Sequence, residues 1–230
     1  DGIQTQMTDM SATDELFFTR AGLDRRRTES IVDGALAKAD DGELFLEYRQ
    51  SESLVFDDGR LRSASFDTTQ GFGLRAVAGE ATGYAHASDL SEGAIKRAAE
   101  TVESVSRGYG GTMAAAPAQT NRHLYVDDNP LQEVDFETKV KLLAEIDAYA
   151  RARDPRVRQV MVNLMGVWQA VQILRAGGEA RADIRPLVRL NVQVVAGQGE
   201  RLETGNEGRG GRAGYAAWLT EDNWKAQVDE

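Results

Sequence analysis

Cysteine is absent from the 230 residues of this sequence, and histidine occurs only twice. The absence of cysteine excludes disulfides, thiolate metal ligands and a cysteine nucleophile within these residues. A catalytic zinc usually takes three protein ligands, often with two histidines at helical spacing, whereas His86 and His123 lie far apart. We therefore predict no metal ligands here, and we expect both histidines to be surface or hydrogen-bonded residues.

Long apolar runs are missing as well. No stretch approaches the length that a membrane-spanning helix requires. The polar opening, DGIQTQMTDMSATDE, has neither the basic start nor the apolar segment of a secretory signal peptide. These features predict a cytoplasmic protein with no membrane partner.

Basic residues are too few to balance the acidic ones. The sequence has 27 Lys and Arg against 37 Asp and Glu, a formal net charge of −10. Such a chain repels phosphate backbones unless a local basic patch overrides the average. The run Arg25–Arg27 is typical of a solvated helix face, and one Arg-Gly-Gly triplet at Arg209 falls short of a repeated RNA-binding tract. We therefore expect no nucleic-acid partner. An RNA-binding domain is the remaining alternative, and it would show an affinity that falls steeply with salt.

Motifs that carry chemistry are incomplete. Gly71 to Ala76 matches a loose dinucleotide fingerprint, but it leads into a second predicted strand and not into a helix. Gly205 to Arg212 lacks the Lys-Ser/Thr pair of a phosphate-binding loop. The neighbouring carboxylates Asp57/Asp58 and Asp127/Asp128 are typical of solvated turns, and no Ser-His-Asp or Lys-centred set can be assembled. The residues alone therefore predict no catalytic group.

Hydrophobic periodicity predicts two successive units of the same kind. Each unit reads as a helix, about four strands and a second helix, separated by short Gly-containing turns. The predicted N-cap residues are Asp24, Ser91, Asp135 and Thr220. We expect the first helix to close at Gly42 and the second to end with Gly108 as its C′ residue. The predicted fold class is α+β, with two helix–antiparallel-sheet–helix units that each form a two-layer sandwich.

A Gly-rich segment from Gly108 to Gln119 predicts a boundary between domains. We place an N-terminal domain at residues 14–118 and a second domain at residues 119–230. Residues 1–13 are expected to be disordered or to have been added in cloning.

The segment from Arg185 to Tyr215 is the most informative part of the sequence. Its first residues alternate apolar and polar, as in a strand with one buried face, and a turn is predicted at Gly197–Gly199. A return strand is predicted from Glu200 to Thr204, and the five glycines between Gly205 and Gly214 then predict a loop. Such a loop is either the rim of a groove that holds a partner through backbone hydrogen bonds or an ordinary surface loop.

Two blocks of this sequence resemble a known family. The block DDGRLRSASFDTTQGFGLRAVAGEATGYAHASDL, from Asp57 to Leu90, resembles the first domain of the TldD/PmbA family. The blocks RPLVRLNVQVV and GRGGRAGY, between Arg185 and Tyr215, resemble its central domain. The match is closer to the TldD-type subunit and extends from about Leu16 onward, so the two predicted domains correspond to the family's N-terminal and central domains.

The resemblance implies a zinc metallopeptidase that hydrolyses unfolded or extended peptides as a homodimer or as a heterodimer with a PmbA/TldE-type subunit. In the family, zinc-activated water attacks the peptide carbonyl with a glutamate as general base. The family's His-Glu-x-x-x-His helix and further metal ligand belong to a C-terminal domain, and neither is found here. We therefore expect this part to be non-catalytic and to form the substrate groove and subunit contacts.

The glycines are the predicted peptide-binding residues, because bare backbone allows close approach of an extended chain. Gly208, Gly210, Gly211 and Arg212 are the first candidates, and Gly71 and Gly73 are the second. A turn or packing role is the alternative for all of them. At the level of the protein, the alternative is a stand-alone module that binds peptides or a partner subunit without hydrolysis.

Overall fold

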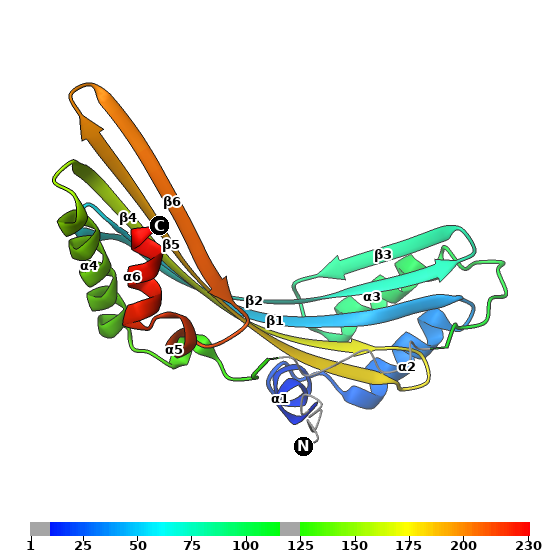
Figure 1. Cartoon of the computed structure of the whole chain (residues 1–230). Coiled ribbons are helices and arrows are strands. Elements are labelled where there is room, and N and C mark those ends of the chain that lie inside the picture. The colour runs from blue at the N-terminus through cyan, green and yellow to red at the C-terminus, as the bar shows by residue number, and fades with distance from the viewer. Residues whose placement is uncertain (1–9, 116–124) are drawn as a thin grey trace, which may run out of the picture. The chain divides into compact units, whose positions relative to one another are not determined.

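A six-stranded sheet with helices packed on it forms the framework (Figure 1). The computed structural model describes residues 10–115 and 125–230. The strand order is β3-β2-β1-β4-β5-β6, and the β2–β3 and β5–β6 pairs are antiparallel. This arrangement confirms the α+β class. The elements are α1 (Met10–Asp14), the π-helical η1 (Glu15–Arg20), α2 (Arg25–Leu36), β1 (Asp41–Asp57), β2 (Arg60–Ala78), β3 (Ala81–Ala87), α3 (Glu92–Glu103), the 3-10 turn η2 (Pro130–Gln132), α4 (Phe136–Arg153), β4 (Val157–Leu174), β5 (Ala180–Gln198), β6 (Arg201–Gly211), α5 (Tyr215–Trp218) and α6 (Glu221–Asp229).

The described residues divide into two compact units. Unit 1 holds residues 10–49, 69–115 and 169–184, and unit 2 holds Gln50–Thr68, Tyr125–Trp168 and Arg185–Glu230. Four strands, β1, β2, β4 and β5, contribute residues to both units. The boundary predicted at residues 118/119 lies outside the described residues and stays a prediction. Of residues 1–13, expected to be disordered or added in cloning, those from Met10 onward form the helix α1.

The strands are longer and fewer than the sequence predicted. Within residues 10–115 and 125–230, each half of the sequence contributes three strands, and the prediction of about four was wrong. Leu44 and Phe56 belong to one strand, β1, because no glycine or proline interrupts the chain between Leu44 and Phe56. In β4, the one glycine, Gly166, packs against the hydroxyl end of the Tyr215 side chain and does not break the strand.

The predicted helix starts are confirmed, and two predicted helix ends are wrong. Each predicted N-cap side chain accepts a hydrogen bond from the backbone N–H three residues later, at 2.8 to 3.4 Å. The four N-cap residues are Asp24, Ser91, Asp135 and Thr220. The first helix ends at Leu36, and Gly42 lies in β1, where a Cβ would overlap the carbonyl oxygen of Arg75. The second ends at Glu103, well before Gly108.

Tight turns join the hairpins at positions with positive φ. Asp58 and Gly59 connect β1 to β2 with φ of 51° and 79°, so Asp58 lies in a turn, as expected for its carboxylate. Gly79 joins β2 to β3 with φ of 60°. The β5–β6 turn is Gly199-Glu200, later than the predicted Gly197–Gly199, and Gly199 has φ of 63°.

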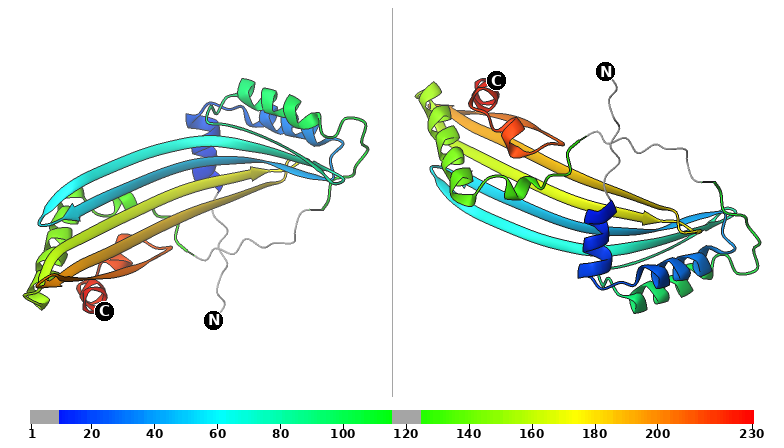
Figure 2. Two further views of the ribbon diagram at one scale, coloured as in Figure 1. Left: turned by 90° about the horizontal axis from the view of Figure 1, so that it is seen from above. Right: turned by 90° about the horizontal axis from the view of Figure 1, so that it is seen from below.

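Unit 1 buries one face of its strands under two helices. Figure 2 shows α2 and α3 side by side, and α3 also packs on β3. Leu44 and Leu74 from the strands and Ile95 from α3 are fully buried. This apolar layer supplies the main stabilisation of the unit.

Arg75 organises a charged cluster in unit 1. Its guanidinium donates to Asp41 and Glu43 at 2.7 Å, and Arg175 reaches Asp41 at 2.8 Å. Burial alone would raise the pKa of Asp41. The hydrogen bonds from the Arg75 side chain and the Gly42 N–H together outweigh that effect, so the pKa of Asp41 lies below its usual value. The cluster therefore favours the charged form of the Asp41 carboxyl next to its two arginine partners.

Unit 2 has its core between α4 and the strands. Leu143 and Ile146 of α4 and Val162 of β4 are fully buried and belong to one apolar cluster. Trp224 of α6 joins this cluster and meets the Tyr149 ring edge-on, with centroids 5.4 Å apart. The helix predicted to begin after Thr220 therefore packs on the core through Trp224.

A buried ion pair ties α4 of unit 2 to β1. Lys139 Nζ lies 2.6 Å from Glu52 Oε1, and the two side chains are 2% and 10% exposed. The Tyr215 hydroxyl donates to the same Glu52 oxygen at 2.7 Å, and Lys139 also donates to the carbonyl of Leu131. Burial, followed by the bond to Glu52, raises the pKa of Tyr215 far above its usual value, so the phenol stays neutral and acts as a donor.

We expect Lys139→Met to lower the free energy of unfolding by about 3–5 kcal/mol, because it leaves the Glu52 carboxylate buried without its cation. Urea unfolding followed by circular dichroism measures this change. The matched control is Lys141→Met on the same helix, where the side chain is 80% exposed and its Nζ lies 3.9 Å from a Glu145 carboxylate oxygen. That control is expected to change stability by less than about 0.5 kcal/mol. Equal effects of both substitutions would contradict a special role for the buried pair.

Candidate peptide-binding edge

The Gly-rich segment forms a strand and not the predicted loop. Residues Arg201 to Gly211 form β6 and pair continuously with β5, from Gln198↔Arg201 to Val188↔Gly211. The loop prediction was wrong because pairing with a regular, half-buried β5 compensates for the low strand propensity of glycine. Arg201 to Gly211 therefore belong to the sheet, and the backbone of β6 is held in place.

Three of the four glycines in β6 occupy crowded positions. A Cβ at Gly210 would overlap the carbonyl oxygen of Val188, and one at Gly211 would lie 2.6 Å from the indole of Trp218. A Cβ at Gly208 would meet the side-chain ends of Asn191 and Arg189. These contacts support the packing role that the sequence left open for Gly208, Gly210 and Gly211.

The outer edge of β6 has free backbone groups. β6 is the last strand of the sheet, and within residues 10–115 and 125–230 no strand pairs with its other side. In an antiparallel pair, every second residue of a strand directs its backbone N–H and C=O groups to the partner strand, and the residues between direct theirs away from it. The two-residue turn makes Gln198 and Arg201 a hydrogen-bonded pair, and the alternation along β6 is counted from there. The outward residues are Leu202, Thr204, Asn206, Gly208 and Gly210.

A contact from α6 supports this assignment of inward and outward residues along β6. The side-chain amide of Gln227 donates at 2.9 Å to the carbonyl oxygens of Leu190 and Glu207, which the same count places between β5 and β6. Of the predicted residues, Gly208 and Gly210 therefore direct their backbone groups to the free edge, whereas Gly211 faces β5.

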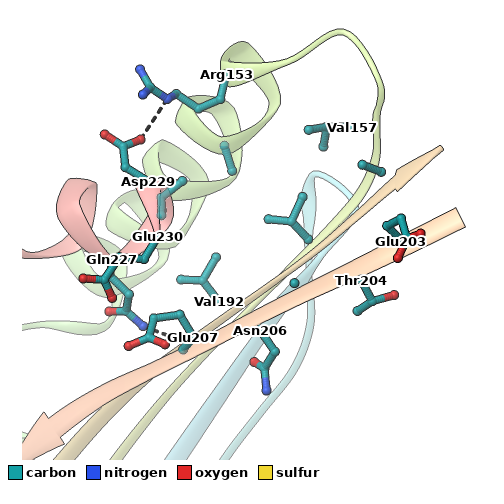
Figure 3. Close-up of a pocket in the computed structure, with 15 residues that line it drawn as sticks. Arg153, Val157, Val192, Glu203, Thr204, Asn206, Glu207, Gln227, Asp229 and Glu230 are labelled. Atoms are coloured by element: carbon teal, nitrogen blue, oxygen red, sulfur yellow. Dashed lines mark hydrogen bonds and ion pairs between the residues drawn. The ribbon is translucent and has the colours of Figure 1, made fainter. Parts of the chain in front are cut away.

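A pocket of about 400 Å³ opens beneath β6, on the side that carries α4 and α6 (Figure 3). Apolar side chains of β5 and of the two helices form much of its lining, and residues of β6 form one wall. The lining residues are Ala150, Arg153, Val157, Val192, Val194, Ala196, Glu203, Thr204, Gly205, Asn206, Glu207, Gln227, Val228, Asp229 and Glu230.

The rim of this pocket is mostly acidic. Figure 3 shows Arg153 of α4 reaching Asp229 of α6, with Nε 2.8 Å from the carboxylate. Outside the lining, Arg209 contacts Glu230 at 2.7 Å and Glu207 at 3.6 Å. The hydrogen bond to Glu230, opposed by partial burial, raises the pKa of Arg209 above its usual value. The lining itself has four carboxylates and one guanidinium.

Arg212 lies just beyond β6. Its guanidinium is 6.0 Å from the centre of the Tyr125 ring, and one nitrogen donates to the carbonyl of Pro186 at 3.5 Å. Arg212 is therefore held near the end of β6 by other residues of unit 2. Its role in peptide contact stays a prediction.

Gly71 and Gly73 lie in unit 1, on β2 where it pairs with β3. A Cβ at Gly71 would be 2.7 Å from the carbonyl oxygen of Ala87, and one at Gly73 would be 2.7 Å from the Tyr84 hydroxyl. Both line a separate cavity of about 300 Å³, beside the stacked rings of Tyr84 and His86. His86 is exposed, which confirms the expectation of a surface histidine.

Metal ligands are not gathered in the part of the chain that the structure describes. Across residues 10–115 and 125–230, no three side chains of His, Cys, Asp or Glu form a group that could hold a metal ion. His123 lies outside these residues. The described residues therefore do not fit the zinc site that the family resemblance implies. Helices long and apolar enough to cross a membrane are likewise absent from them.

Family models match two parts of this chain. Residues 42–106 match the model described as PmbA/TldA metallopeptidase domain 1, and residues 129–230 match the PmbA/TldA metallopeptidase central domain. The chain belongs to the PmbA/TldD family. The family resemblance seen in the sequence is thus confirmed.

Relatives place the match in part of a longer protein. The Metalloprotease TldD homolog of Haemophilus influenzae is 36% identical over 178 residues, which is 76% of this chain and 37% of that protein. The crystal structure of TldE from Thermococcus kodakarensis shares the fold, with a TM-score of 0.59 and 14% identity over 95% of this chain and 46% of its own. A Bacteroides thetaiotaomicron structure described as a candidate modulator of DNA gyrase matches with a TM-score of 0.68 and 13% identity, covering 89% of this chain and 48% of its own. This PmbA/TldD-family chain spans less than half the length of these relatives.

Sequence reasoning missed the pocket beneath β6. The apolar positions Val192, Val194 and Val228 were visible as periodic patterns, but periodicity does not show which helix covers which strand. It also left peptide binding and packing as alternatives for every glycine of the segment, without separating one glycine from another. Only the distances to Val188 and Trp218 distinguish the crowded glycines from Gly205, whose Cβ would meet nothing within 4 Å.

We expect Gly211→Leu to lower the free energy of unfolding by about 1–3 kcal/mol, because the new side chain must displace Trp218. Gly205→Leu is the matched change in the same strand and should leave stability unchanged or slightly raised. Thermal unfolding of both variants measures the difference. A loss at Gly205 as large as that at Gly211 would contradict the open space assigned there.

Proposed function

We propose that this chain is the non-catalytic N-terminal part of a TldD-type metallopeptidase and that the free edge of β6 holds an extended peptide substrate. The single observation that supports this most is the outer edge of β6, which no strand among the described residues covers and where Thr204, Asn206 and Gly208 offer alternate backbone N–H and C=O groups. A peptide that pairs there gains affinity from main-chain hydrogen bonds and depends little on its sequence.

The glycines of β6 support this role in an indirect way. Gly208 and Gly210 have no side chains, so nothing projects from them beside a strand that approaches the edge. Their crowded inner surroundings explain why the positions lack side chains, and the outer edge stays accessible as a result. Packing and peptide binding are therefore compatible for these residues.

For the whole protein, we propose zinc-dependent hydrolysis of unfolded or extended peptides in the cytoplasm. The metalloprotease relatives support the hydrolytic activity and a metal, and the fold shared with TldE supports pairing with a PmbA/TldE-type subunit. The subunit contacts assigned to this part stay within the same proposal. The stand-alone binding module would show the same peptide affinity, but its open reading frame would lack a following His-Glu-x-x-x-His sequence.

Backbone methylation of a peptide tests the edge directly. We expect a fluorescent octapeptide to lose at least about tenfold in affinity when its odd-numbered backbone nitrogens are methylated and to keep its affinity when the even-numbered ones are, or the reverse. The reason is that a paired strand directs only alternate N–H groups to its neighbour. Fluorescence anisotropy with the 230-residue chain measures both peptides. Equal loss, or no loss, in the two would contradict strand addition.

Metal content tests the assignment of catalysis to residues elsewhere in the parent protein. The purified 230-residue chain, after exposure to zinc and desalting, is expected to retain well under one equivalent and to leave a quenched fluorescent peptide intact. Elemental analysis and a fluorescence time course provide the two readings. Stoichiometric zinc together with hydrolysis would overturn the non-catalytic assignment.

A further inference from the structure

Gly205 is the one glycine of β6 that the surrounding atoms do not require. A Cβ there would meet nothing within 4 Å, and its φ lies outside the left-handed range. Gly205 pairs with Val194 and lines the pocket beneath β6. Because the added atom would enter open space, the missing side chain leaves that pocket accessible from the strand.

The pocket has an apolar floor next to Gly205. Val192 and Val194 of β5 and Val228 of α6 line it, and its volume of about 400 Å³ exceeds that of one aliphatic side chain. A strand added to the outer edge of β6 places alternate side chains on the face that Gly205 shares with the pocket. A residue directly opposite Gly205 can therefore extend into the space that Gly205 leaves empty.

Acidic residues flank Gly205 at equal spacing along β6. Glu203 and Glu207 lie two residues before and two residues after it, so all three point to the same face, and both carboxylates line the pocket. Glu203 contacts Arg201 at 2.7 Å and Glu207 contacts Arg209 at 3.6 Å. The first pair is exposed and the second is partly exposed, and ion pairs that reach solvent are weak, so both carboxylates can exchange partners.

We propose that this pocket is a side-chain subsite for a peptide of the form basic-x-aliphatic-x-basic, bound as a strand along β6. The aliphatic side chain enters the pocket opposite Gly205, and the two Lys or Arg side chains face Glu203 and Glu207 as cross-strand pairs. The proposal rests on the proposed peptide-binding role of β6 and adds a preference for particular side chains. Such a preference makes the edge selective among extended peptides.

Three fluorescent peptides test the preference: Lys-Ser-Leu-Ser-Lys, Lys-Ser-Gly-Ser-Lys and Glu-Ser-Leu-Ser-Glu, each with blocked ends. We expect the first to bind the 230-residue chain about tenfold more tightly than the second, because the leucine is buried in the pocket. The third is expected to bind more weakly than the first by about threefold or more, with the difference shrinking at high salt.

Gly205→Leu tests the pocket itself, because its side chain occupies the space meant for the peptide. The variant is expected to bind the leucine and glycine peptides equally, while Gly110→Leu, at another glycine with open surroundings in unit 1, keeps the tenfold preference. Circular dichroism checks that both variants fold. The double variant Glu203→Gln/Glu207→Gln is expected to lose the preference for lysine over glutamate and to keep that for leucine over glycine.

The outcomes separate this subsite from the edge. If the three peptides bind the unaltered chain equally, or if Gly205→Leu keeps the leucine preference, the subsite is overturned while strand addition stands on the methylation result. If none of the peptides binds and the methylated pair shows no alternation, the subsite and the peptide-binding edge are both overturned.

Discussion

Backbone pairing between β5 and β6 is the interaction on which the candidate site depends. β5 has a regular apolar face toward the core, with Val188, Leu190 and Val192 nearly fully buried, and this fixes its register. β6 has no comparable face, and most of its first residues are exposed. Its position therefore comes from main-chain hydrogen bonds to β5, and the same kind of bond remains available on its outer side.

The end of β6 is fixed by a different interaction. After Gly211 the chain turns toward Tyr215, which is fully buried and bonded to Glu52 of β1. Lys139 completes this network from α4, so a buried charge pair and a phenol hold the segment that follows the strand. A buried network of this kind is satisfied only in one arrangement, which favours a single exit path for the chain. The position of β6 is therefore set by its pairing register with β5 and by the buried polar network that holds the residues after its end.

Local rules in the sequence predicted much of the fold. The caps at Asp24 and Asp135, the turn position of Asp58 and the alternation in β5 each follow from a few neighbouring residues, and all were confirmed. The path of β6 did not follow from such rules, because glycines predict a loop until their pairing partner is known. The Lys139–Glu52 pair joins residues 87 positions apart, which no local pattern shows.

The passage of β1, β2, β4 and β5 through both compact units has a consequence for the history of the molecule. Neither unit corresponds to one continuous stretch of chain. Exchanging one continuous gene segment for another could therefore not replace a whole unit without also changing the other. A shift of one residue within any of these four strands would disturb packing in two places at once. Insertions are therefore expected to be tolerated at the turns and connections and not within these four strands.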